Sequence, residues 1–361
     1  MFHFSKIQNS LRTKNYLCTM RYLLFPFSIT YSCITAFRNL LFDYGIFKSK
    51  TYNIPIICIG NLSAGGTGKT PHTQYIIDLL KSKYQVAILS RGYGRKGSTL
   101  QYVKETSKVS LVGDEPLQLK QNNPNCLVVV EKIRNKGVQQ ILKDYPETKV
   151  ILLDDGYQHR WIKSGINILI TPYSSPYYKD YHIPVGNLRE SKKGAERADA
   201  IIFSKTPENS NPTQRKGMIE QLHLFAHQQA YFSRINYSTW KCIKTNKEFN
   251  PNEKESITLV SGIVNCDPLV QYLQEKGHTV NHVKFADHHN YNSNDIDNIL
   301  KQYNKDSSTK KLILTTEKDA TKLRAFEGKF NKVSAYYIPI EIDFEQKERF
   351  DKQILDYVAQ N

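Results

Sequence analysis

The sequence lacks closely spaced cysteines. Its six cysteines are scattered over 361 residues and none forms a Cys-x-x-Cys pair, so neither a disulfide framework nor a zinc site is indicated. Such cysteine usage is typical of a protein in a reducing cytosol. The six positions are Cys18, Cys33, Cys58, Cys126, Cys242 and Cys266.

An apolar run long enough to cross a membrane is also missing. Residues 22–37 carry no charge, but this segment falls short of the ~20 residues that a spanning helix needs. The apolar pattern resumes after Arg38 and reaches Phe47, and basic residues flank it on both sides. We therefore expect residues 20–50 to form a helix or helical hairpin that lies in a membrane interface, preceded by a tail at 1–19.

Two other interpretations of this segment stay open. A cleaved signal peptide would use Arg12, Lys14 and Arg21 as its charged region, but no small-residue cleavage site follows. A buried core helix would be apolar as well. Met20 is a second candidate for the start of the chain.

Acidic residues are scarce relative to basic ones. The chain has 34 Asp and Glu against 50 Lys and Arg, which leaves a formal charge of +16. This excess favours an anionic partner such as a nucleotide, a nucleic acid or an acidic membrane surface. The basic residues are not interleaved with aromatic residues as in known nucleic-acid modules, so we expect no nucleic-acid partner. Nothing in the sequence implies a stable protein partner.

A glycine-rich segment at 63–70 follows the apolar run 54–59 and precedes a helical pattern. This order is that of a strand, a phosphate-binding loop and a helix. Lys69 would neutralise the β- and γ-phosphates, and the Thr70 hydroxyl would bind Mg²⁺. The strict motif has glycine where this chain has Ser63, and we expect Gly65 and Gly66 to supply the flexibility. The loop residues are Ser63, Ala64, Gly65, Gly66, Thr67, Gly68, Lys69 and Thr70.

Short apolar runs alternate with helical patterns along the rest of the chain. Strands buried on both faces and separated by helices predict an α/β fold with a parallel sheet flanked by helices, as in P-loop NTPases. We expect this nucleotide-binding core at 51–200 and a smaller α/β lobe at 201–361 that completes the active site. Within the second lobe, 230–237 and 240–243 could form a hairpin.

Paired acidic residues stand where such a fold places its ligands, at the carboxyl ends of strands. Asp154 and Asp155 end an apolar strand, and one of them would hold Mg²⁺ directly or through water. Asp114 and Glu115 stand in a Gly-Asp-Glu-Pro turn and could divide the roles of base and metal contact, although a capped helix start explains them equally well. His288, next to an aspartate, could share a proton, or could be a solvated loop histidine.

Arginines in loops at the same edge could bind acidic groups with two parallel hydrogen bonds. Each is weak evidence alone, because surface arginines are usually solvated. These residues are Arg91, Arg95, Arg160 and Arg189.

Several motifs in order resemble the tetraacyldisaccharide 4'-kinase family. They are Ile-Gly-Asn-Leu-Ser-Ala-Gly-Gly-Thr-Gly-Lys-Thr-Pro at 59–71, Ser-Arg-Gly-Tyr-Gly at 90–94, Gly-Asp-Glu-Pro at 113–116, Asp-Asp-Gly-Tyr-Gln-His at 154–159, Gly-Asn-Leu-Arg-Glu at 186–190 and Thr-Thr-Glu-Lys-Asp-Ala at 315–320. The resemblance runs from about residue 20 to residue 325. Asn187 departs from the proline expected there, and 207–256 has no strong match.

The resemblance implies an ATP- and Mg²⁺-dependent kinase that phosphorylates the 4'-hydroxyl of an acylated glucosamine disaccharide 1-phosphate to give lipid IVA. The enzyme would work on the cytoplasmic face of a bacterial inner membrane. Asp114 would be the base and His288 its partner, with Lys69 on the phosphates. Thr70, Glu115, Asp154 and Asp155 would serve the metal, and Arg91, Tyr93, Gln158, His159 and Arg189 would bind the substrate.

A P-loop switch or assembly NTPase that acts on a protein partner is the alternative. It would hydrolyse the nucleotide without any acceptor. A GTPase is disfavoured, because Ser204-Lys205-Thr206-Pro207 lacks the last member of the guanine-selecting Asn-Lys-x-Asp motif.

Overall fold

The computed structural model describes residues 23–251 and 254–361, so the expected tail and Met20 lie outside the described residues. The helices are α2 (Phe25–Asp43), α3 (Lys69–Leu80), α4 (Val109–Val112), α5 (Asp114–Asn122), α6 (Arg134–Asp144), α7 (Pro212–Glu220), α8 (Asp267–Glu275), α9 (Ser293–Lys305), α10 (Glu317–Leu323) and α11 (Lys347–Gln360), with 3₁₀ turns η1 (Tyr177–Lys179), η2 (Lys192–Arg197) and η3 (Arg324–Phe330).

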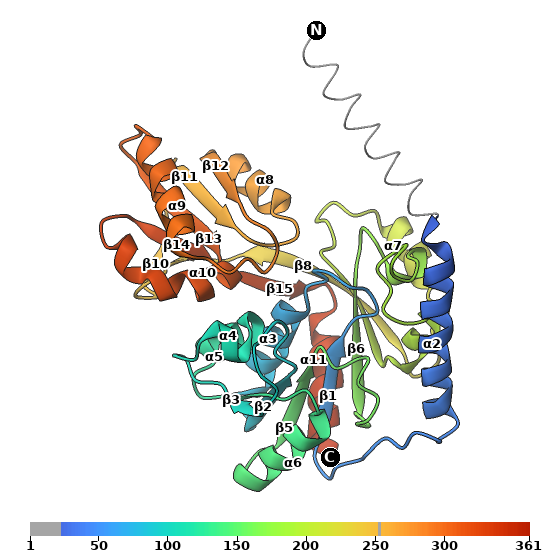
Figure 1. Cartoon of the computed structure of the whole chain (residues 1–361). Coiled ribbons are helices and arrows are strands. Elements are labelled where there is room, and N and C mark those ends of the chain that lie inside the picture. The colour runs from blue at the N-terminus through green and yellow to red at the C-terminus, as the bar shows by residue number, and fades with distance from the viewer. Residues whose placement is uncertain (1–22, 252–253) are drawn as a thin grey trace.

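The strands form two sheets, one in each lobe of Figure 1. They are β1 (Ile56–Gly60), β2 (Val86–Ser90), β3 (Gln101–Tyr102), β4 (Leu127–Val130), β5 (Val150–Asp154), β6 (Ile166–Pro172), β7 (Ala200–Ser204), β8 (Gln229–Tyr237), β9 (Trp240–Cys242), β10 (Glu248–Phe249), β11 (Ser256–Ser261), β12 (Thr279–Lys284), β13 (Lys311–Thr316), β14 (Ala335–Ile338) and β15 (Ile340–Phe344).

The first sheet has nine strands in the order β15-β8-β7-β6-β1-β5-β2-β4-β3. Its interior strands are parallel, and the edge strands β3 and β15 run antiparallel to their neighbours. The central strands β1, β2, β5 and β7 are buried along their whole length, which explains their continuous aliphatic sequences. The predicted α/β fold with a parallel sheet flanked by helices is confirmed.

The second sheet has six strands in the order β10-β9-β14-β13-β11-β12 and carries its own apolar core. Helices α8 and α9 connect its parallel strands, and α10 follows β13 directly. A smaller second α/β lobe is therefore present, as the sequence predicts.

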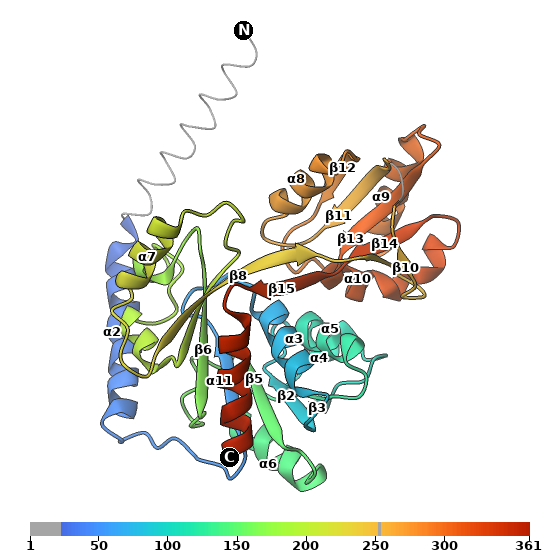
Figure 2. The ribbon, with the colours of Figure 1, turned by 180° about the vertical axis from the view of Figure 1, so that it is seen from behind.

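The chain passes between the lobes along a two-stranded ribbon of β8 and β15 (Figures 1 and 2). It leaves the first sheet at Tyr237 and returns at Ile340, and these two residues are paired across the ribbon. The predicted hairpin at 230–243 is wrong, because β8 pairs with β7 and β15 whereas β9 pairs with β10 and β14. The division expected at residue 200 lies beside β7, inside the nine-stranded sheet.

Helix α2 lies along the outer side of the first lobe, away from the second (Figures 1 and 2). Its outward face exposes large apolar side chains, which are Phe27, Ile29, Ile34, Phe37 and Leu40. Polar side chains on the opposite side of α2 form hydrogen bonds with groups of the first lobe. None of the helices in the described ranges is both long enough and apolar enough to span a membrane.

Candidate active site

The glycine-rich loop joins β1 to α3 at the carboxyl edge of the first sheet. Gly65 and Gly68 have φ angles of +106° and +92°, in the left-handed region that favours glycine. Ser63 is not among the residues with positive φ, and it pairs with Leu188 in an antiparallel bridge. A side chain is therefore tolerated at 63, where the strict motif has glycine.

Side chains from other segments hold this loop in place. Asn61 donates to the Thr67 hydroxyl at 2.8 Å, and the Ser204 hydroxyl donates to the Thr67 carbonyl at 2.7 Å. Lys205 Nζ donates to the Gly66 carbonyl at 2.6 Å. The end of β7 thus contacts two consecutive carbonyls of the loop, a role of Ser204 and Lys205 that their sequence context does not indicate.

Asp155 is the acidic residue closest to the loop lysine. Its carboxylate lies 3.6 Å from Lys69 Nζ and receives two hydrogen bonds from Arg189, at 3.0 and 3.3 Å. Burial by itself would raise the pKa of Asp155, but the charges of Lys69 and Arg189 outweigh burial and lower that pKa. Asp155 is therefore an anion that is neutralised from two sides.

Asp154 lies in a different environment, although it is the next residue. It is fully buried, and its two oxygens accept hydrogen bonds from the hydroxyls of Thr73 at 3.2 Å and Ser90 at 3.0 Å. Burial and the neighbouring Asp155 raise its pKa. The hydroxyls orient Asp154 without neutralising it, so it is available to a cation.

Asp114 and His288 come from different lobes and meet at 2.8 Å. Asp114 is the first residue of α5 and its Oδ2 contacts His288 Nδ1, while its Oδ1 accepts the N–H of Glu115 at 3.0 Å. Lys318 and Lys322 of α10 lie 3.9 and 3.3 Å from the same carboxylate. Burial would raise the pKa of Asp114, but His288 and the two lysines lower it well below its usual range.

Glu115 stands between the two acidic groups. Burial raises its pKa, and the charges of Asp154 and Asp114 raise it further, while Lys318 and Lys69 act in the opposite direction. Its oxygen lies 3.9 Å from Lys318 Nζ. The positive charge around Glu115 therefore does not offset its burial and the neighbouring carboxylates. A bound cation would supply the missing positive charge.

The five candidate substrate residues have different surroundings. Tyr93 is exposed, and its ring centroid lies 5.7 Å from that of His288, while Arg189 contacts Asp155. Both residues therefore face the acidic cluster, which consists of Asp114, Glu115, Asp154 and Asp155. Gln158 donates to Glu190 at 2.9 Å and to a backbone carbonyl, and is thus engaged within the first lobe. Arg91 is exposed. His159 is partly buried, and this burial, together with the charges of nearby arginines, lowers its pKa to about 4.

Two arginines expected at this edge turn elsewhere. Arg95 is buried and donates to the Thr99 carbonyl at 2.8 Å. Arg160 pairs with Asp43 at the end of α2 at 2.6 Å. Sequence position put them in the right loops but could not show the direction of their side chains.

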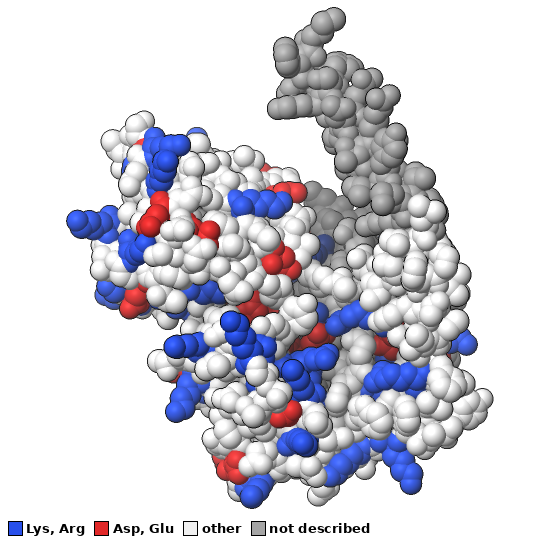
Figure 3. Space-filling model, in the orientation of Figure 1, with Lys and Arg blue, Asp and Glu red and all other residues white. Residues whose placement is uncertain are grey.

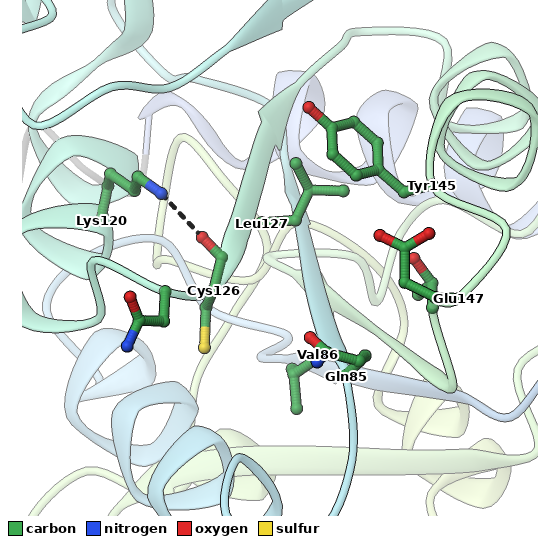
Figure 4. A pocket seen from close by; sticks show the side chains of 9 residues that line it. Gln85, Val86, Lys120, Cys126, Leu127, Tyr145 and Glu147 are labelled. Carbon is green, nitrogen blue, oxygen red and sulfur yellow. Dashed lines mark hydrogen bonds between the residues drawn. The ribbon is translucent and has the colours of Figure 1, made fainter.

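A cavity of about 220 Å³ lies at the opposite, amino-terminal edge of the first sheet (Figure 4). Its lining includes the starts of β2 and β4, and Lys120 there donates to the carbonyl of Cys126 at 2.9 Å. The acidic cluster instead lies where the lobes meet, and Figure 3 shows Asp and Glu among Lys and Arg along that border. The cavity is therefore not the candidate active site.

Comparisons with known proteins show which family the chain belongs to. The family model for tetraacyldisaccharide-1-P 4'-kinase matches residues 20–359. A tetraacyldisaccharide 4'-kinase of Flavobacterium johnsoniae is 40% identical over 344 residues, which cover 95% of this chain and 98% of that protein. One of Phocaeicola vulgatus is 37% identical over 350 residues, covering 94% and 95%. This chain belongs to the tetraacyldisaccharide 4'-kinase family.

A solved structure of the family is similar over almost the whole chain. The crystal structure of "apo" form LpxK from Aquifex aeolicus in complex with ATP matches with a TM-score of 0.74 and 29% identity, and covers 94% of this chain and 99% of that one. The two-lobed fold described above is therefore the fold of the family.

Sequence reasoning missed several charged residues of this tetraacyldisaccharide 4'-kinase family member. Lys318 and Lys322 contact Asp114 from the second lobe, and the motif at 315–320 could have drawn attention to Lys318. Arg134 is buried just after β4, and its Nε has no hydrogen-bond partner among the described residues. An arginine after a short strand carries no sequence signal, because its burial depends on how neighbouring strands pack.

Proposed function

We propose that this chain transfers the γ-phosphate of ATP to the 4'-hydroxyl of tetraacyldisaccharide 1-phosphate, giving lipid IVA in lipid A biosynthesis. The observation that carries the proposal is the Asp114–His288 contact at 2.8 Å, which places a base of one lobe against a histidine of the other. Glu115 lies beside this pair, and its pKa is raised by the charge of Asp154 and lowered by that of Lys69 at the glycine-rich loop. An acceptor hydroxyl at Asp114 would therefore lie next to a phosphate held at Lys69.

In this reaction the bond from the γ-phosphorus to the bridging oxygen breaks and a bond to the 4'-oxygen forms. The hydroxyl proton goes to Asp114. The low pKa of Asp114 makes it a weak base, but phosphoryl transfer through a loose transition state needs orientation of the hydroxyl more than early deprotonation. His288 supports Asp114 by donating from Nδ1.

Mg²⁺ fits the oxygen ligands at this edge. Thr70, Glu115, Asp154 and Asp155 offer only hydroxyl and carboxylate oxygens, which Mg²⁺ prefers. No cage of three such acidic or histidine side chains is preformed within 23–251 and 254–361. This agrees with a metal that is held by one or two carboxylates together with phosphates and water. When bound, the ion would neutralise charge on the phosphates.

The position of α2 suits an acceptor that stays in a bilayer. Its outward face is apolar, while Tyr31 donates to the carbonyl of Arg189 and Arg38 donates to the carbonyl of Gln158. The loops that carry two candidate substrate residues therefore lie directly under the helix. Moving an acylated lipid out of the bilayer costs about 0.8 kcal/mol of free energy per methylene, so the enzyme must work at the membrane surface. We place it on the cytoplasmic face of a bacterial inner membrane.

Transfer of labelled γ-phosphate from Mg-ATP to tetraacyldisaccharide 1-phosphate in detergent micelles tests the proposal. We expect a phosphorylated lipid with the wild type and a loss of roughly 10²–10⁴ in kcat with Asp114→Asn, the range for a general base. Lys69→Ala should also be strongly impaired. Asp297→Asn, an exposed aspartate paired with Lys329, is the matched control. ATP hydrolysis without any lipid product would support the switch NTPase instead.

A further inference from the structure

Three consecutive side chains at the start of α10 contact three different parts of the site. The motif at 315–320 spans the end of β13 and the first turn of α10, where the Thr316 hydroxyl caps the helix by accepting the N–H of Asp319. Glu317, Lys318 and Asp319 then point to separate partners around His288. The catalytic roles proposed above do not account for this motif.

Asp319 holds the backbone that carries the histidine. It is fully buried, and its Oδ2 accepts the N–H of Gly262 at 2.9 Å while Tyr291 donates to Oδ1 at 3.0 Å. The carbonyl of Gly262 in turn accepts the N–H of His288 at 3.2 Å. His288 has a φ of +55°, which is costly for a residue other than glycine and requires such surroundings.

Glu317 connects α10 to the other lobe. It accepts a hydrogen bond from Gln118 at 2.7 Å, and Gln118 lies one turn after Asp114 on α5. Glu317 therefore sets the position of α10 relative to the helix that carries the base.

Lys318 contacts the ring itself. Its Nζ lies 3.1 Å from His288 Nε2 and 3.9 Å from Asp114 Oδ2, so the ammonium group contacts both members of the pair. The anionic Asp114 carboxylate can only accept from Nδ1, and an ammonium group this close to Nε2 opposes a proton on that nitrogen. The ring proton is then on Nδ1, where it is donated to Asp114.

We propose that Lys318 is a positioning residue that keeps His288 neutral with its Nδ1 proton directed at Asp114, while Glu317 and Asp319 fix the two backbones. The inference rests on the proposed function for the roles of Asp114 and His288. A neutral ring beside a carboxylate leaves the pair one negative charge, whereas an imidazolium would cancel that charge and weaken the base.

The charges that face His288 act in opposite directions. The hydrogen bond to Asp114 raises its pKa and Asp287, 3.7 Å from Nε2, adds to this, whereas Lys318 lowers it. Lys322 lies behind Asp114 at 3.3 Å, and the Tyr93 ring covers one side of the histidine. Removing the charge of Lys318 should therefore raise the pKa of His288, by about one unit for a charge at this distance.

The test is the His288 titration followed by NMR in the full-length protein without nucleotide, together with the pH profile of kcat/KM. With Lys318→Met we expect the histidine pKa and the acidic limb of the profile to move up together by about one pH unit. The KM for ATP should change little. Lys318→Arg keeps a charged donor and should restore both values, and Lys329→Met is the matched control on an exposed lysine.

Three results would overturn the inference. They are an unshifted His288 titration, a uniform loss of activity at every pH, and a raised KM for ATP as the main effect. If Lys318→Met does not fold, Lys318→Gln removes the same charge and should give the same shift. A wild type without lipid product contradicts the proposed function alone, because the NMR titration needs no substrate.

Discussion

Lys205 shows how a single side chain outside the glycine-rich segment can order it. Its Nζ donates to the Gly66 carbonyl at 2.6 Å, and its own φ of +57° is held beside the buried Ser204 and Thr206. We expect Lys205→Met to raise the KM for ATP about three- to tenfold with a smaller change in kcat, because the loop loses a charge-assisted hydrogen bond worth roughly 1 kcal/mol at an exposed position. Steady-state kinetics over a range of ATP concentrations measures this. Lys205→Arg should behave as the wild type, and an unchanged KM contradicts the assignment.

His288 gives a residue-scale prediction about pH and stability. Its pKa is raised in the folded protein, chiefly by the hydrogen bond to Asp114, above the value of about 6.5 for an unfolded chain. Protonation of His288 therefore stabilises the folded state, and this stabilisation is fully present below pH 6.5. It is lost as the pH rises through the folded pKa. The difference in Tm between wild type and His288→Gln should thus be larger at pH 6 than at pH 9. A difference that grows toward pH 9 would falsify this sign.

Individual site residues differ in how far the sequence could reveal them. Lys69 and Asp155 belong to local motifs, and the structure brings them to 3.6 Å. The meeting of Asp114 with His288 was available only through the family resemblance, because the two residues come from different lobes. Lys322 has no motif of its own, and its contact with Asp114 depends on where α10 docks.

At the scale of elements, α2 combines an apolar outward face with polar contacts inward. We expect Ile34→Asp with Phe37→Asp to lower binding to phosphatidylethanolamine and phosphatidylglycerol vesicles at least about tenfold, because each lost apolar side chain costs about 1.5–3 kcal/mol at an interface. Vesicle sedimentation measures the binding, and nucleotide affinity should stay the same. The control is Ile34→Leu with Phe37→Leu, which keeps an apolar face. Equal sedimentation of both variants would contradict a membrane role for this face.

Strands buried on both faces were predictable, and edge elements were not. Residues 127–130 and 150–153 form continuous aliphatic runs that coincide with β4 and β5 to within one residue. β12 was not predicted, because it is an edge strand of mixed exposure without an aliphatic run. The hairpin at 230–243 failed because the antiparallel partner of β8 is β15, about a hundred residues later, and local turn signals cannot show such a pairing.

At the scale of the whole molecule, the two lobes have separate cores joined by one ribbon. The nine-stranded lobe buries β15 and the apolar face of α11, including Phe350 and Ile354, against its own strands. The six-stranded lobe has its own clusters around Val260 and Leu259. A division at residue 200 would cut β7, β8, β15 and α11 from the first core. The separable unit is instead the excursion between Tyr237 and Ile340.

This organisation predicts that the first lobe folds without the second. Tyr237 and Ile340 are paired in the antiparallel ribbon, so replacing 238–339 by Asn-Gly should close a hairpin in the native register. We expect this variant to unfold cooperatively and to bind ATP, because the glycine-rich loop is intact. It should transfer no phosphate, because His288 and Lys318 are absent. Circular dichroism melting and a fluorescent ATP analogue measure the two properties.

The register itself supplies the control for this excision. Joining Asn236 to Ile340 by the same turn shifts β15 by one residue against β8, which turns Ile342 and Phe344 from the core toward solvent. Burial of two such side chains is worth several kcal/mol, about 1.5–3 for each, a large part of the stability of a domain. The shifted variant should therefore melt far lower or not fold. If both variants melt alike, the ribbon does not set the register. If neither folds, the first core depends on the second lobe through contacts such as that between Gln118 and Glu317.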